Sequence, residues 1–211
     1  MHLDHLSFAA GHEGLKGTAE RLSARLGTPY YDGGFHPSFG TRNCILPLAA
    51  GHYVEVVEVL DHPAADKAPF GQAVRQQSAS GGGWLAWVVS VDDLGAVEQR
   101  LGRTAVEGHR RLPDGYLLEW QQIGVKGMQN DPQLPFFIQW QSDVSRHPSA
   151  GGSDVELVRL EIGGEHDRLD EWLGGQAHLI LDDVEIDWTA SDGQPGLQAA
   201  VFATSSGKVR I

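Results

Sequence analysis

The chain has 211 residues, of which 41% are hydrophobic and 21% are charged, and its formal net charge is -12. These fractions are typical of a globular protein with a sizeable core. The acidic balance argues against nucleic acid or a membrane as a partner, because both attract clustered Lys and Arg. No apolar run approaches the ~18 residues of a membrane span, and no signal peptide is recognised at the start. The single cysteine, Cys44, excludes an intrachain disulfide and favours a reducing compartment, so we expect a cytoplasmic protein.

The first 80 residues predict a module with the order β-α-β-β-β. Residues 3–10 alternate polar and apolar side chains with the period of a strand. Residues 15–26 carry an apolar stripe at helical spacing, and Gly27 is a typical helix end. Three more strands, the first interrupted by a Gly-Gly turn signal and a proline, are predicted at residues 30–39, 42–48 and 53–60.

The same order begins again after a predicted helical connection at residues 69–77 and a flexible glycine joint at 81–83. The second module, residues 81–148, is predicted to contain strands at 84–91, 104–112, 116–123 and 136–140 and a helix at 94–101. A repeat of this period indicates stacked supersecondary units, because one module is too small to bury its own sheet face. Residues 1–148 are therefore expected to form one domain of two modules.

The tail, residues 153–211, follows a linker at residues 147–152 and is predicted to be a third, abbreviated module. Its expected elements are a helix at 168–173 and strands at 155–162, 178–181, 184–188, 198–203 and 208–211, with a hairpin turn at Asp192-Gly193. Two modules suffice for a closed cup, so this tail has no obvious partner within the chain. We expect a homodimer joined through the tails. The alternative is that the tail folds back and seals the first two modules.

Four segments resemble the strands of a glyoxalase-like domain of the vicinal oxygen chelate superfamily. They are LDHLSF at residues 3–8, RNCILPL at 42–48, GHYVEVV at 51–57 and PFFIQW at 135–140. The resemblance covers residues 3–148 and implies an α+β fold whose repeated βαβββ modules form a curved, cup-shaped mixed sheet. The superfamily includes glyoxalase I, methylmalonyl-CoA epimerase, extradiol dioxygenases and antibiotic-resistance proteins.

The resemblance also implies a site inside the cup. Metalloenzymes of the superfamily hold a divalent metal with a His on the first strand and a Glu or His on the fourth strand of each module. His5 and Glu55 match these positions, as catalytic residues and as ligands of Zn, Mn, Ni or Fe. The second module departs from the pattern, because Ala86 falls near the His5 position and Gln139, or Ile138 in a shifted register, replaces the carboxylate. A site with a metal and a site without one both stay open.

Other side chains are candidates for substrate contact. They are Arg42, Trp87, Trp120, Gln139 and Trp140, although tryptophans in strands are more often part of the core. Glu55 has a structural alternative, a salt bridge to Arg42, and Glu58 on the opposite face of the strand is expected to be solvated.

The remaining histidines and glycines are not assigned to the site. His36 and His52 lie near loops and are expected on the surface, and His147 is expected to be a linker residue. The glycines at 81–83 precede a strand rather than a helix, so no nucleotide cofactor is expected.

The sequence therefore favours a protein that binds a small polar molecule in a sheet cup. One hypothesis is an enzyme with lyase, isomerase or dioxygenase chemistry, in which Glu55 takes a proton beside an oxygen held by His5 or a metal. The alternative is a binding or sequestering protein of the resistance type, with an apolar, aromatic cup.

Overall fold

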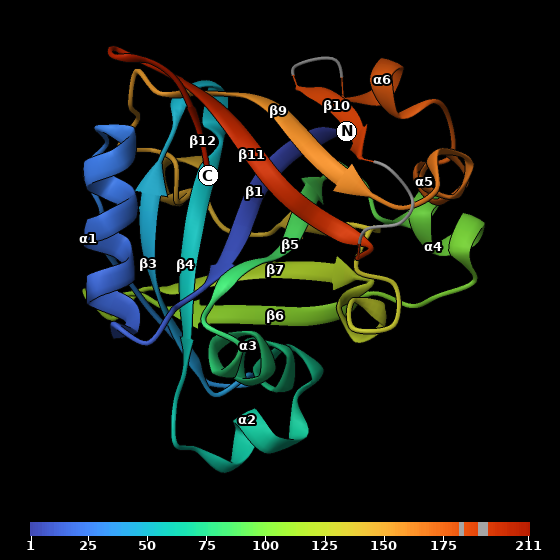
Figure 1. Ribbon diagram of the computed structural model, residues 1–211. Coiled ribbons are helices and arrows are strands. Elements are labelled where there is room, and N and C mark those ends of the chain that lie inside the picture. Colours follow the sequence, from blue (N-terminus) through green and yellow to red (C-terminus); the bar gives the residue numbers. More distant parts are fainter. Residues whose placement is uncertain (182–183, 190–193) are drawn as a thin grey trace.

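Eight strands from two modules close into a barrel in the computed structural model, which describes residues 1–181, 184–189 and 194–211. The strand order is β1-β4-β3-β2-β6-β7-β8-β5, and a second sheet of four strands lies against the barrel (Figure 1). The predicted α+β class, with two βαβββ modules and a smaller C-terminal unit, is confirmed. Within the described ranges, no helix combines the length and the apolar character needed to cross a membrane.

The two modules have the same topology. The first consists of β1 (His2–Ala9), α1 (Gly14–Leu26), β2 (Tyr31–His36), β3 (Thr41–Pro47) and β4 (Tyr53–Val59). The second consists of β5 (Gly83–Ser90), α4 (Gly95–Leu101), β6 (Val106–Arg111), β7 (Leu117–Ile123) and β8 (Phe136–Trp140). In each module the first strand pairs in parallel with the fourth, and the modules join where β1 runs antiparallel to β5.

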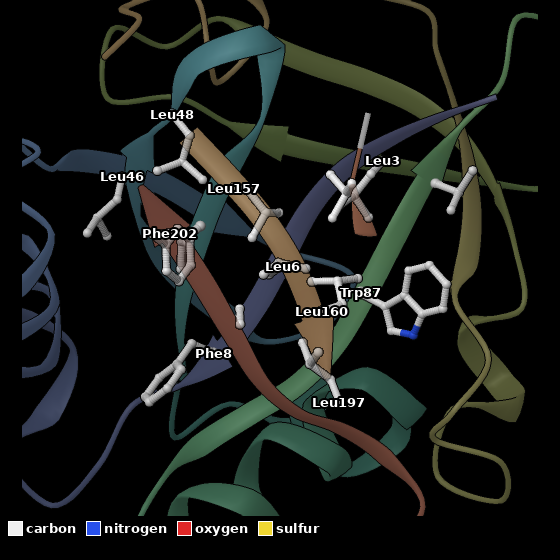
Figure 2. Close-up of a cluster of buried hydrophobic side chains, with 14 of the residues drawn as sticks. Leu3, Leu6, Phe8, Leu46, Leu48, Trp87, Leu157, Leu160, Leu197 and Phe202 are labelled. Carbon is white, nitrogen blue, oxygen red and sulfur yellow. The ribbon is translucent and has the colours of Figure 1, made fainter. Parts of the chain in front are cut away.

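Alternation along the strands divides the apolar side chains between two faces of the barrel. The outward set, including Leu6, Phe8 and Trp87, packs against α1, α4 and the C-terminal sheet (Figure 2). The inward set, including Val57 and Val88, packs against α3 (Pro69–Ala79), the predicted helical connection, which follows the short helix α2 (Pro63–Lys67). Phe70, Ala73 and Val74 of α3 therefore share one buried cluster with the inward-facing side chains of the barrel.

The tail forms its own sheet in the order β10-β9-β11-β12. Its elements are β9 (Glu156–Gly163), α5 (His166–Leu173), α6 (Ala177–Ile180), β10 (Glu185–Thr189), β11 (Gly196–Thr204) and β12 (Gly207–Arg210). Short 3-10 turns lie at Ala49–Gly51, Val125–Gly127 and Val144–Arg146. The predicted strand at 178–181 is wrong, because most of this run lies in the helix α6. The backbone N–H of Ala177, the first residue of α6, donates a hydrogen bond to Asp170. A four-residue apolar run does not distinguish the two structures. The predicted Asp192-Gly193 turn lies outside the described residues.

The C-terminal sheet folds back onto the outer face of the barrel. Leu157, Leu160 and Phe202 join one buried cluster with Leu6 and Phe8, and β11 and β9 cross over β1 and β5 (Figures 1 and 2). The expectation that the tail lacks a partner within the chain is therefore wrong, and the alternative, a tail that seals the first two modules, is observed. The homodimer stays a prediction, and the uncovered face on which it was based is covered in this chain.

Candidate functional site

Inward-facing polar and aromatic side chains of the barrel surround a small cavity of about 30 Å³. Every strand of the barrel except β3 and β5 contributes, and Phe39 and Phe70, from the β2–β3 loop and α3, close one side. The lining residues are His5, His36, Phe39, Tyr53, Glu55, Phe70, Arg110, Trp120, Gln122, Phe136, Ile138 and Trp140. The structure thus brings together four of the predicted site residues, His5, Glu55, Trp120 and Trp140.

Glu55 lies at the centre of β4, beside Ser7 on β1, and only 5% of its surface is exposed. Its carboxylate accepts hydrogen bonds from Ser7 Oγ at 3.1 Å and from Asn43 Nδ2. His36 Nε2 lies 3.5 Å away. Burial alone would raise the pKa of Glu55, but His36, His5 and Arg110, together with the Asn43 hydrogen bond, lower it below its usual value. Glu55 is therefore ionised at neutral pH.

Arg110, on β6, is the cation of the cavity, and the sequence analysis assigned it no role. It is 2% exposed, its Nε has no hydrogen-bond partner among the described residues, and its Nη1 lies 4.0 Å from Glu55 Oε1. The hairpin register offered a signal: Gly108 pairs with Trp120, and Arg110 lies two residues further on the same face. Because Trp120 is predicted to line the cup, the same register predicts that Arg110 also faces the cup.

Asp4 orients His5 from behind the cavity wall. Its buried carboxylate accepts from His5 Nδ1 at 2.7 Å, Trp140 Nε1 at 2.9 Å and His147 Nε2 at 3.3 Å. Burial would raise the pKa of Asp4, but the hydrogen bonds from His147 and His5 bring it well below its usual range. Because an ionised carboxylate only accepts, His5 carries its proton on Nδ1, and Nε2 is the ring nitrogen left for the cavity. The His5 ring also stacks on Tyr53 at 4.4 Å.

Strand alternation predicts that Asp4 points away from the site that contains His5, because neighbouring strand residues normally point to opposite faces. The pairing of β1 with β5 shifts register between Leu3 and His5. This irregularity at Asp4 lets two consecutive polar side chains share one network, as β-bulges commonly do near functional sites.

Two histidines expected at the surface, His36 and His52, are buried, whereas His147 lies in the segment between β8 and β9, as expected for a linker residue, and contacts Asp4. His36 is 4% exposed and lines the cavity, and its Nδ1 shares a hydrogen bond with Thr41 Oγ1. Burial lowers its pKa to about 4, so the ring is neutral at pH 7. His52 is also buried, stacked on His2, and His147 is held by Asp4. The burial of His36 and His52 depends on tertiary packing that a local pattern does not contain.

Three predicted contact residues lie away from the cavity because of strand alternation. Trp87 points outward into the core and donates to the Gln133 carbonyl. Gln139 binds the backbone at Asp92 and Leu94, at the start of α4. Arg42 forms a two-bond ion pair with Glu58, at 2.6 and 2.8 Å. The proposed salt bridge between Arg42 and Glu55 is therefore wrong, and Glu58 is paired rather than simply solvated.

The donor set does not fit the metal that the resemblance implies. Among the described residues, no group of three or more His, Cys, Asp or Glu side chains is placed to hold a metal ion. The second module adds no donor: Ala86 pairs with Ser7, and Val88 pairs with His5. In the first module, Glu55 pairs with Ser7, and in the second module Phe136 pairs with Val88 in the same way. Phe136, rather than Gln139 or Ile138, therefore occupies the position of a second carboxylate.

Comparisons with known proteins agree with this architecture. A hypothetical protein from Staphylococcus aureus is similar in structure over 100% of this chain and 85% of its own, with a TM-score of 0.62 and 14% identity. Methylmalonyl-CoA epimerase from Mycobacterium tuberculosis is similar over 65% of this chain and 85% of its own, with a TM-score of 0.44 and 16% identity. At 14% identity, the likeness to the Staphylococcus aureus protein speaks for the fold alone. No curated protein matches the sequence. The model of the glyoxalase-like domain matches residues 3–177, and the chain therefore belongs to the glyoxalase-like domain family.

Proposed function

We propose that the protein is an enzyme that moves a proton on a small carbonyl compound held in the barrel cavity, which is isomerase or lyase chemistry. The observation that carries the proposal is Glu55, an ionised and buried carboxylate that faces a cavity. A carboxylate so placed accepts a proton from a carbon next to a carbonyl group, as a general base.

His5 is the second proton carrier in this proposal. Asp4 fixes its Nδ1, so that Nε2 faces the same cavity as Glu55 and exchanges a proton with the substrate. The aromatic wall, which includes Phe70, Trp120 and Phe136, limits water near the reacting carbon. Because the donor set does not fit a metal ion, no step in this mechanism passes through one.

A binding protein is the second candidate, and the aromatic lining supports it. Five phenyl or indole rings contact the cavity, from Phe39, Phe70, Trp120, Phe136 and Trp140. Such rings bind a flat apolar group without any chemistry.

Hydrogen–deuterium exchange tests the enzymatic proposal without knowledge of the natural substrate. A panel of small aldehydes, ketones and thioesters is incubated with the protein in D2O, and loss of the α-proton signal is followed by NMR. Glu55→Gln should slow exchange by roughly 10²–10⁴-fold. Glu58→Gln is the matched control, since Glu58 lies on the same strand, outside the cavity and bound to Arg42.

The same assay separates the alternatives. Exchange that is equal in the wild type and Glu55→Gln would overturn the role of Glu55. Ligands that raise the melting temperature without any exchange would favour the binding protein. Exchange that is lost on chelation and restored by Zn, Mn, Ni or Fe(II) would favour metal-assisted chemistry.

A further inference from the structure

We infer that Arg110 is the fixed cation that binds the negative oxygen formed when the substrate loses its proton. This inference rests on the proposed function, and it assigns to a side chain the task that a metal ion performs in related enzymes. The ligand class that follows is a compact carbonyl compound whose conjugate base is an enolate. The evidence lies in how Arg110 is buried and in what it fails to contact.

Arg110 is not used as a structural ion pair. Two exposed arginines of this protein show the usual geometry, because Arg42 reaches Glu58 at 2.6 Å and Arg210 reaches Glu161 at 2.7 Å, each with more than one hydrogen bond. Arg110 is far more buried, yet its Nη1 lies 4.0 Å from the Glu55 carboxylate, and its Nε has no hydrogen-bond partner in the part of the chain that the structure describes. An unsatisfied buried donor is costly, so a ligand that satisfies it is favoured.

The charges that line the cavity suit a reaction better than they suit permanent binding of an anion. Glu55 carries a negative charge and Arg110 a positive charge at the same cavity. An anionic ligand that entered beside both would be attracted by Arg110 and repelled by Glu55. This conflict disappears when Glu55 has taken a proton, and then the cation faces a single negative oxygen.

Proton transfer achieves that arrangement without changing the total charge. The C–H bond next to the carbonyl breaks, its proton forms an O–H bond with Glu55, and its electron pair becomes the C=C bond of the enolate. The carbonyl π electrons move onto oxygen, where the guanidinium donates hydrogen bonds to it. The proton then returns to carbon, so no oxidant or other reactant is needed.

Fluoroacetate and fluoroacetamide test the inference as compact probes of equal shape. The planar carboxylate resembles the negative oxygen of an enolate, and the amide is its neutral counterpart. Binding is measured by 19F NMR titration of the whole protein. Arg110→Gln should bind fluoroacetate at least about 10-fold more weakly than wild type, without a comparable change in fluoroacetamide affinity. Arg42→Gln is the control and should leave both affinities unchanged.

Glu55→Gln should change binding in the opposite direction. It imitates the protonated base, so fluoroacetate affinity should rise by roughly 3- to 10-fold while fluoroacetamide affinity stays constant. Arg110→Lys keeps the charge without the fork of donors and should retain part of the wild-type affinity for fluoroacetate. These two variants keep the test valid if Arg110→Gln does not fold, which circular dichroism will show.

The inference is overturned if Arg110→Gln binds fluoroacetate as tightly as wild type, or if Glu55→Gln binds it more weakly than wild type. Its failure is distinct from that of the proposed function. Deuterium exchange that needs Glu55 but not Arg110 would reject Arg110 and keep the base. Anion binding that needs Arg110, without any exchange, would keep the anion site and reject the enzyme.

Discussion

Replacing Asp4 by Asn should move the ring proton of His5 from Nδ1 to Nε2. Trp140 Nε1 can only donate, so the single oxygen of the new amide must face it, at the position of the present 2.9 Å bond. The amide nitrogen then faces His5 Nδ1, which must become an acceptor. The ring proton moves to Nε2, and His5 loses the lone pair that it presents to the cavity.

The cost to stability follows from the three hydrogen bonds that Asp4 accepts. Trp140 and His147 both reach Oδ2, the position of the amide oxygen, so all three contacts survive as neutral bonds, each weaker by about 1 kcal/mol. The total is about 3 kcal/mol, which for a chain of this length lowers Tm by roughly 6–12 °C. Because the folded pKa of Asp4 is lowered, this stability is present above the ordinary pKa of 3.8 and is lost as pH falls below it.

Two measurements on Asp4→Asn check these expectations at pH 7. Long-range 1H–15N NMR should show the His5 proton on Nδ1 in wild type and on Nε2 in the variant, and calorimetry should show the drop in Tm. Asp167→Asn is the matched control, because Asp167 also contacts a histidine, His166, but is fully exposed. An unchanged His5 tautomer, or a Tm within about 1–2 °C of wild type, would refute the reasoning.

Three further predictions concern burial. Burial lowers the pKa of His36 from 6.5 to about 4, so the free energy of unfolding should fall by roughly 3 kcal/mol as pH drops through that interval. In urea melts, His36→Gln should remove this dependence of the unfolding free energy on pH. The same pH dependence in wild type and variant would contradict the prediction. Gly108→Ala should displace Trp120, since a Cβ there lies 2.3 Å from its Nε1, and should break its 2.9 Å bond to Gln122; unaltered tryptophan fluorescence and probe binding would argue against this. Phe202→Ala should destabilise the protein by about 3–5 kcal/mol in chemical denaturation if the tail seals the barrel, and a loss below about 1 kcal/mol would oppose that role.

Much of the fold was predictable because it depends on local periodicity. The alternation at residues 3–10, the helical stripe at residues 15–26 and the glycine that ends it are properties of neighbouring residues. The same parity predicted that His5 and Glu55 face one interior, and the structure brings both to one cavity. Parity also shows where the prediction was inconsistent: Gln139 and Trp140 are adjacent, so only one of them can face that cavity.

The rest of the site was decided by tertiary structure. Asp4 joins it through a register irregularity between β1 and β5, and His147 reaches it from beyond β8, 143 residues away in sequence. Arg110 was assigned no role from the sequence, and only barrel closure buries it beside Glu55. Likewise, the tail carries an apolar face in its sequence, but the surface that covers this face belongs to other strands. Periodicity sets which way a side chain points, whereas its neighbours and its charge environment depend on contacts between segments that are distant in the chain.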